Sequence, residues 1–225
     1  MAKQLTLDLG LRPALGRDDF LVATSNAAAV ALIDQWPNWP SHAAVLVGSP
    51  GSGKSHLAEV WRQVSGAQVV AGRLLTVEAV PTLLRDHALV VEDLTAGEVL
   101  EHALFHLLNF TRQMSGHILF TAVNWPLKGV VLPDLASRLN ALTVAHILPP
   151  DDDLLRGVLV KLFEDRQIAV DEALIGYLVT RMPRSLDMAR LLVARIDVMA
   201  LEQRVEVTRV FAGKVLAELE SPDLL

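Results

Sequence analysis

The sequence contains no cysteine and no apolar run long enough to span a bilayer, which takes about 18 residues. Without cysteine, disulfides and thiolate metal sites are excluded, and a reducing compartment is favoured. The N-terminus also lacks the charged and apolar regions of a signal peptide. We therefore expect a cytoplasmic protein that makes no contact with membranes.

Basic residues are also scarce. The chain has 20 Lys and Arg against 26 Asp and Glu, a net charge of −6. Binding to nucleic acid through its phosphates needs a basic face, so no direct sequence-specific DNA binding is expected. By contrast, hydrophobic residues make up 52% of the 225 residues. That is enough for one globular domain, or for a core with a small second domain.

Three zones follow one another along the chain. Residues 1–17 are interpreted as a flexible tail, and residues 18–150 alternate apolar runs with helical patterns, which predicts a parallel sheet covered by helices. Residues 151–225 look helical, with Pro149, Pro150 and three acidic residues at the boundary. Strands are expected at residues 43–47, 68–70, 88–92, 117–121 and 143–147, and helices at 25–35, 54–64, 98–114, 152–165, 171–181, 185–202 and 208–219.

The most informative motif lies between the first expected strand and the helix that follows it. Residues 48–55, GSPGSGKS, fit the phosphate-loop pattern G-x-x-x-x-G-K-[ST]. Glycines allow successive amide hydrogens to face a phosphate group, and the helix adds the positive end of its dipole. Lys54 is expected to reach the β- and γ-phosphates, and the Ser55 hydroxyl to bind magnesium. The other expected nucleotide contacts in the loop are Gly48, Gly51, Ser52 and Gly53.

The expected strand at residues 88–92 ends in two acids, Glu92 and Asp93. A phosphate-loop ATPase needs a carboxylate here to hold magnesium through water, and often a second one to polarise the attacking water. Taken alone, the pair would be a solvated acidic turn. Because it lies one strand and helix beyond the phosphate loop, we assign Glu92 and Asp93 a magnesium-binding and catalytic role.

These and further residues resemble a known family. Ser25-Asn26, residues 48–56 ending at His56, Glu92-Asp93, residues 121–126, Ser137-Arg138 and residues 183–186 occur in the order found in the AAA+ domain of the bacterial replication initiator DnaA. The resemblance covers residues 18–220 and includes no helix-turn-helix DNA-binding domain, as in the Hda-like regulators that inactivate DnaA. It implies a phosphate-loop AAA+ core with a parallel five-stranded sheet, followed by a small all-helical lid domain, and an ADP or ATP cofactor with magnesium.

The tail adds a second point of resemblance. Residues 4–9, QLTLDL, are similar to the peptide Gln-x-x-Leu-x-Leu/Phe with which such regulators bind the DNA polymerase sliding clamp. In an extended peptide, Gln4 would enter a polar pocket, and Leu7 and Leu9 an apolar groove. An edge strand is the alternative, because the leucines also alternate to one face.

The resemblance also implies roles for residues outside the phosphate loop. His56 belongs to the nucleotide site. Asn124 is preferred over Thr121 as the polar sensor 1 group, whose amide would orient water or contact the γ-phosphate. Arg184 corresponds to the sensor 2 arginine of the lid. Arg138 corresponds to the arginine finger that reaches a nucleotide on a neighbouring subunit, although without the resemblance it would be assigned to a surface ion pair with Asp134.

Two functions from different classes are compatible with these residues. The first is a regulator that binds the clamp and an adenine nucleotide, associates with DnaA or with itself, and stimulates hydrolysis of ATP on DnaA through Arg138. Glu92 stands where the family usually has Asp, which predicts weak or no hydrolysis by the chain alone. The second is an autonomous AAA+ ATPase, such as a DNA-associated motor or helicase-loader-like protein.

Overall fold

A single parallel sheet forms the first part of the structure, a computed structural model that describes residues 21–220 apart from residues 96, 98 and 99. The strand order is β2-β3-β4-β1-β5, and every neighbouring pair is parallel. This confirms the predicted five-stranded parallel sheet. The strands are β1 (Ala43–Gly48), β2 (Gln68–Ala71), β3 (Ala88–Glu92), β4 (His117–Ala122) and β5 (Thr143–Ile147).

Helices cover both faces of the sheet, because successive side chains of a strand point to opposite faces. On one face, Leu46 and Leu119 pack in a core with helices α1 (Ala27–Asp34) and α2 (Lys54–Ser65). On the other, Val45 and Phe120 share a core with a second group of helices. Burial on both faces explains why the strands are continuous apolar runs. The second group of helices is α3 (Val80–Leu83), α4 (Glu101–Gln113) and α5 (Pro133–Asn140), and a short 3₁₀ helix, η2, spans Gly72–Leu74.

The remaining described chain is helical and has its own core, as predicted. Leu155, Phe163, Leu178 and Leu192 are fully buried there. Burying one side chain of this size stabilises the fold by about 1.5–3 kcal/mol. The helices are α6 (Asp152–Glu164), α7 (Glu172–Arg181), α8 (Leu186–Gln203) and α9 (Arg209–Glu220).

The four helices of this part each begin with a side-chain cap. Asp171 accepts a hydrogen bond from the Leu174 amide, and Ser185 accepts one from the amide of Met188. Thr208 caps α9 in the same way. Asp151 caps α6, since its carboxylate accepts the amide hydrogen of Leu154. Such caps fix where each helix begins, and each contributes about 1 kcal/mol.

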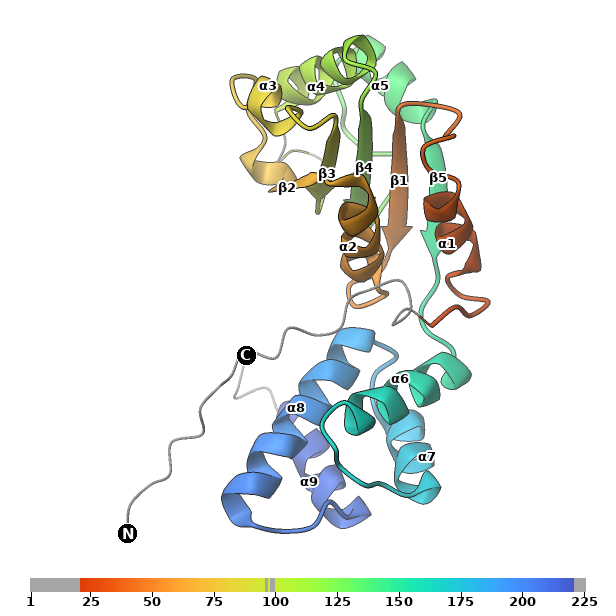
Figure 1. The fold of residues 1–225 in the computed structure, drawn as a ribbon, viewed down its shortest axis with the longest axis vertical. Coiled ribbons are helices and arrows are strands. Elements are labelled where there is room, and N and C mark those ends of the chain that lie inside the picture. Colours follow the sequence, from red (N-terminus) through yellow and green to blue (C-terminus); the bar gives the residue numbers. More distant parts are fainter. Residues whose placement is uncertain (1–20, 96, 98–99, 221–225) are drawn as a thin grey trace.

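All strands end at the same side of the sheet, and the helical part lies below those ends (Figure 1). The two parts are in direct contact, because the Leu186 amide at the start of α8 donates to the carbonyl oxygen of Gly51 at 2.8 Å. The segment before α1 also lies at this edge, where the Leu148 amide donates to the Ser25 carbonyl. A ligand at the carboxyl ends of the strands would therefore lie between the sheet and the helices.

Candidate nucleotide-binding site

The predicted phosphate loop leaves β1 at Gly48 and enters α2 at Lys54. Gly51 and Gly53 have φ angles of 70° and 103°, which side chains other than glycine rarely adopt. A Cβ at Gly48 would lie 2.7 Å from the Ile147 carbonyl oxygen on β5. The glycines are thus required by backbone turns and by a close approach between neighbouring strands.

Lys54 is the cation of this loop. Its side chain is buried, with 7% exposure, and Nζ donates to the carbonyl oxygens of Gly48 and Ser49 at 2.9 Å each. Burial lowers the pKa of Lys54, and the carboxylates of Asp93, Asp187 and Glu92 act in the opposite direction. The ammonium group is therefore held against the main chain of its own loop, in the electrostatic field of three acidic side chains.

The start of α2 offers further groups for a polyphosphate. Its N-cap residue, Gly53, provides no side-chain hydrogen bond, so the first amide groups of the helix are not capped by that residue. The Ser52 hydroxyl is buried and has no hydrogen-bond partner among the described residues. Ser55 is exposed at the second position of α2. A phosphate group fits this arrangement, since it would accept hydrogen bonds that the loop itself leaves open.

Glu92 and Asp93 lie where β3 ends, at the same edge of the sheet. Asp93 has a φ of 54°, and its amide donates to the Thr121 hydroxyl on β4 at 2.9 Å. Within the described ranges, no cluster of three or more His, Cys, Asp or Glu side chains could hold a metal ion by itself. Magnesium would fit here only with nucleotide phosphates as additional ligands, beside Ser55, Glu92 and Asp93.

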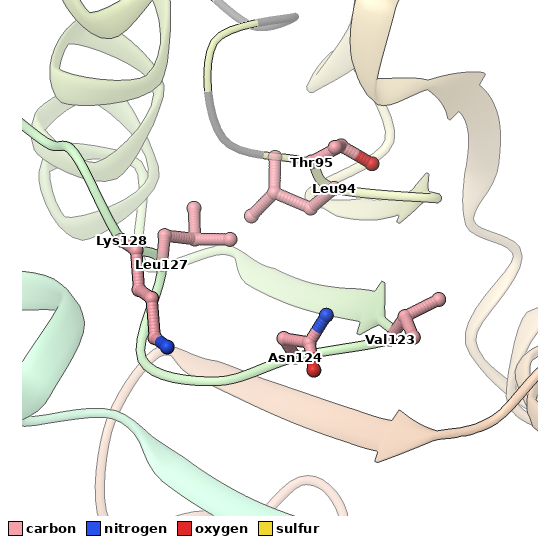
Figure 2. Close-up of a pocket in the computed structure, with 6 residues that line it drawn as sticks. All are labelled: Leu94, Thr95, Val123, Asn124, Leu127 and Lys128. Atoms are coloured by element: carbon pink, nitrogen blue, oxygen red, sulfur yellow. The ribbon is translucent and has the colours of Figure 1, made fainter.

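The two candidates for sensor 1 have different surroundings. Thr121 is fully buried, and its hydroxyl accepts the amide of Asp93, so it holds the turn after β3. Asn124 is exposed in the loop that leaves β4 and lines a pocket of about 240 Å³ (Figure 2). Only Asn124 is accessible to a ligand, so the preference for it remains a prediction supported by its exposure. The pocket is lined by Leu94, Thr95, Val123, Asn124, Leu127 and Lys128.

Arg184 belongs to the helical part, which we call the lid, and lies beside its connection to the sheet. Its guanidinium forms an ion pair with Asp152 at 2.8 Å and donates to the Pro150 carbonyl at 3.4 Å. The neighbouring residue Ser185 is closer to the phosphate loop, because its Oγ would lie 2.1 Å from a Cβ at Gly51. The predicted contact between Arg184 and a nucleotide stays a prediction.

A second lid arginine, missed by the sequence reasoning, contacts the core. Arg190 Nη2 lies 3.1 Å from Nδ1 of His56 on α2, and Arg190 Nη1 lies 3.4 Å from Asp187. His56 thus contacts the helical part through Arg190, and its predicted contact with a nucleotide stays a prediction. The spacing of three between Asp187 and Arg190 on one helix face was the available signal, but the partner on α2 cannot be read from it.

Arg138 lies apart from all these residues. On β5, Ile147 pairs with Gly48 at the phosphate-loop end and Thr143 pairs with Ala44 toward the other. Since α5 ends at Asn140, just before β5, the five residues of that strand separate α5 from the loop by about 15 Å. Figure 1 shows α5 at the end of the sheet that faces away from the lid.

Arg138 makes a ring contact in place of the ion pair considered from the sequence. Its guanidinium carbon lies 5.1 Å from the centroid of the Phe105 ring on α4. In the described part of the chain, Arg138 has no ion pair with Asp134 or with any other acid. Among the described residues, the Phe105 ring rather than a carboxylate therefore holds the guanidinium.

Two further predictions concern other parts of the chain. Gln4, Leu7 and Leu9, the predicted clamp-binding residues, lie outside the described residues. Over residues 21–220, with the three gaps given above, no helix combines the length and apolar character needed to cross a bilayer.

Comparison with solved structures gives the fold. Domain III of the Thermotoga maritima replication initiation protein DnaA matches with a TM-score of 0.76 at 19% identity, over 93% of this chain and 98% of that one. AMPPCP-bound DnaA from Aquifex aeolicus matches with a TM-score of 0.67 at 18% identity, over 85% and 68%. The Thermotoga maritima RuvB Holliday junction branch migration motor matches with a TM-score of 0.66 at 16% identity, over 87% and 68%. No protein-family model and no curated protein sequence matched. The chain thus has the fold that DnaA domain III and RuvB share.

Proposed function

We propose that this chain is a nucleotide-binding regulator of replication initiation that stimulates hydrolysis of ATP bound to DnaA. It binds ADP or ATP with magnesium at its phosphate loop and presents Arg138 to the partner's nucleotide. The loop geometry, buried Lys54 and the open Ser52 hydroxyl support nucleotide binding. The likeness to DnaA bound to AMPPCP supports an adenine nucleotide.

The position of Arg138 is the observation that carries the proposal. The length of a strand separates it from the chain's own phosphate loop, and no acidic side chain of the described residues neutralises it. A guanidinium placed in this way acts on a nucleotide of a neighbouring molecule. There it stabilises the charge that develops on the transferred phosphoryl group, an effect of about a thousandfold or more in rate.

The test is hydrolysis of DnaA-bound ATP in the presence of clamp-loaded DNA. The intact chain should stimulate it, and Arg138→Ala should abolish the stimulation while nucleotide binding by the chain is kept. Arg112→Ala is the matched control, since Arg112 is an exposed arginine on α4, the helix against which Arg138 packs. Full stimulation by Arg138→Ala, or none by the intact chain, would reject the proposal.

Binding to the sliding clamp through Gln4, Leu7 and Leu9 is a separate part of the proposal, based on the sequence of the tail. Capture of purified clamp by the intact chain should be lost in Gln4→Ala and kept in the neighbouring Lys3→Ala variant. Equal capture by all three proteins would place clamp binding elsewhere in the chain. No capture by any of them would exclude clamp binding.

An autonomous ATPase is the second candidate, favoured by the likeness to Thermotoga maritima RuvB, a Holliday junction branch migration motor. That function requires steady turnover by the chain alone, which Lys54→Ala should remove. The regulator requires little turnover without DnaA. A steady-state ATPase measurement on the purified chain separates the two.

A further inference from the structure

The segment that leads into α5 is bound by a carboxylate from another helix. Glu101, the first residue of α4, accepts the Val131 amide at Oε1 (2.7 Å) and the Leu132 amide at Oε2 (2.8 Å). These residues are about thirty positions apart in the sequence. The contact therefore fixes one helix relative to the other, rather than a local turn.

This contact holds the two residues that come directly before α5. Leu132 is the N-cap residue and gives no side-chain hydrogen bond, and Pro133, the next residue, has no amide hydrogen. A carboxylate near the positive end of a helix is favourable. The two amide hydrogen bonds also lower the pKa of Glu101, with a smaller contribution from His102, so the group is charged at neutral pH.

The same face of α4 also holds the side chain of Arg138. Phe105 lies one turn after Glu101 on α4, and the two residues share a face because they are four positions apart. The Phe105 ring contacts the Arg138 guanidinium at 5.1 Å. Glu101 thus fixes the start of α5, and Phe105 supports the arginine near its end.

We propose that Glu101 is a positioning residue that sets the place of α5, and through it the direction of the Arg138 guanidinium toward a partner's nucleotide. The inference rests on the proposed function for the role of Arg138, while the contact itself is a property of this chain. An arginine finger accelerates hydrolysis only when its guanidinium is already correctly positioned before the partner binds. Misplacement by about 1 Å costs about a hundredfold in rate.

The first test concerns this chain alone and needs no partner. Amide hydrogen exchange of a peptide covering residues 131–139 should be slow in the intact chain and clearly faster in Glu101→Ala. Glu101→Gln should be intermediate, because its side chain keeps a single acceptor oxygen. Glu78→Ala, which removes an exposed acid ahead of α3, and His102→Ala, beside Glu101, are the controls. Unchanged exchange in Glu101→Ala would overturn the proposal whatever the chain does to DnaA.

The second test measures the consequence in DnaA-bound ATP hydrolysis. Glu101→Ala should lower the maximal stimulated rate by about ten- to a hundredfold, with little change in the concentration of chain that gives half of the effect. In an Arg138→Ala background it should add no further loss, because it acts through Arg138. Full stimulation by Glu101→Ala, with Arg138→Ala inactive, would refute the positioning role and leave the proposed function intact. A failure of the intact chain to stimulate would instead reject the proposed function, and the exchange experiment would still decide the role of Glu101.

Discussion

The two ends of the sheet differ in how they are built. At the carboxyl end, one contiguous stretch of sequence forms the phosphate loop, and its main chain and Lys54 supply the binding groups. At the opposite end, Arg138 depends on α4, through Phe105 and the bonds of Glu101 to the start of α5. The first site is a local property of the chain and the second a property of its packing. Changes at the two ends should therefore have separable effects.

Removing the ammonium group from the phosphate loop should give the largest effect in the chain alone. Lys54→Ala is expected to weaken binding of ADP with magnesium by about a hundredfold, because charge-assisted hydrogen bonds to phosphate contribute about 1.5–3 kcal/mol. Calorimetric titration measures it, with the exposed Lys214→Ala as the control. Unchanged ADP affinity would mean that the loop does not bind phosphate.

The close contact between the loop and the lid should appear in stability. Gly51→Ala combines a φ of 70° with a Cβ that would lie 2.1 Å from Ser185 Oγ, and we expect a loss of about 2–3 kcal/mol. Gly66→Ala is a matched control, since Gly66 has the same φ of 70° but nothing within 4 Å of its Cβ. Gly66→Ala should therefore cost only about 1 kcal/mol, the ordinary cost of a side chain in the left-handed region. Denaturant unfolding that gives equal losses for both would show that the lid is not packed on the loop.

A smaller effect is expected from the caps of the lid helices. Ser185→Ala and Thr208→Ala each remove a cap worth about 1 kcal/mol in unfolding free energy. Ser185 also borders Gly51, whereas Thr208 caps α9. Only Ser185→Ala should alter nucleotide affinity in a titration. Equal nucleotide affinity in both variants would show that the lid contributes nothing to the nucleotide site, which would then belong to the sheet part alone.

A pH effect should arise at the amino end of β4, which begins at His117. Burial lowers the pKa of His117, and nearby His42 lowers it further, while a hydrogen bond to Pro37 opposes them. The unfolded chain then binds more protons than the folded one. The unfolding free energy should therefore fall as the pH drops below the ordinary value of 6.5 and level off below the folded pKa. In His117→Gln, urea unfolding at several pH values should show a smaller fall.

Features encoded in contiguous sequence were predictable. The five strands are continuous apolar runs, and the phosphate loop and the caps Asp171 and Ser185 each follow a local rule. The short helices α3 and α5 were missed, because stretches of four and eight residues give little helical period. The hydrogen bond from the Asp93 amide to the Thr121 hydroxyl, which distinguishes Thr121 from Asn124 as a candidate for sensor 1, is visible only in the structure.

Contacts between distant residues could not be predicted in this way. The partner of Arg190 is His56 on α2, and the partner of Arg184 is Asp152 on α6. The Phe105 contact of Arg138 joins two helices that only the fold brings together. Sequence patterns show which residues have suitable chemistry, whereas packing decides which of them meet.

The most direct test of the separation between the two ends compares Lys54→Ala and Arg138→Ala in two assays, the chain's own ADP affinity and the hydrolysis of ATP on DnaA. Arg138→Ala should leave ADP affinity unchanged and abolish stimulated hydrolysis, whereas Lys54→Ala should weaken ADP binding directly. If Arg138→Ala weakened ADP binding as Lys54→Ala does, Arg138 would belong to the chain's own site and the account would be wrong.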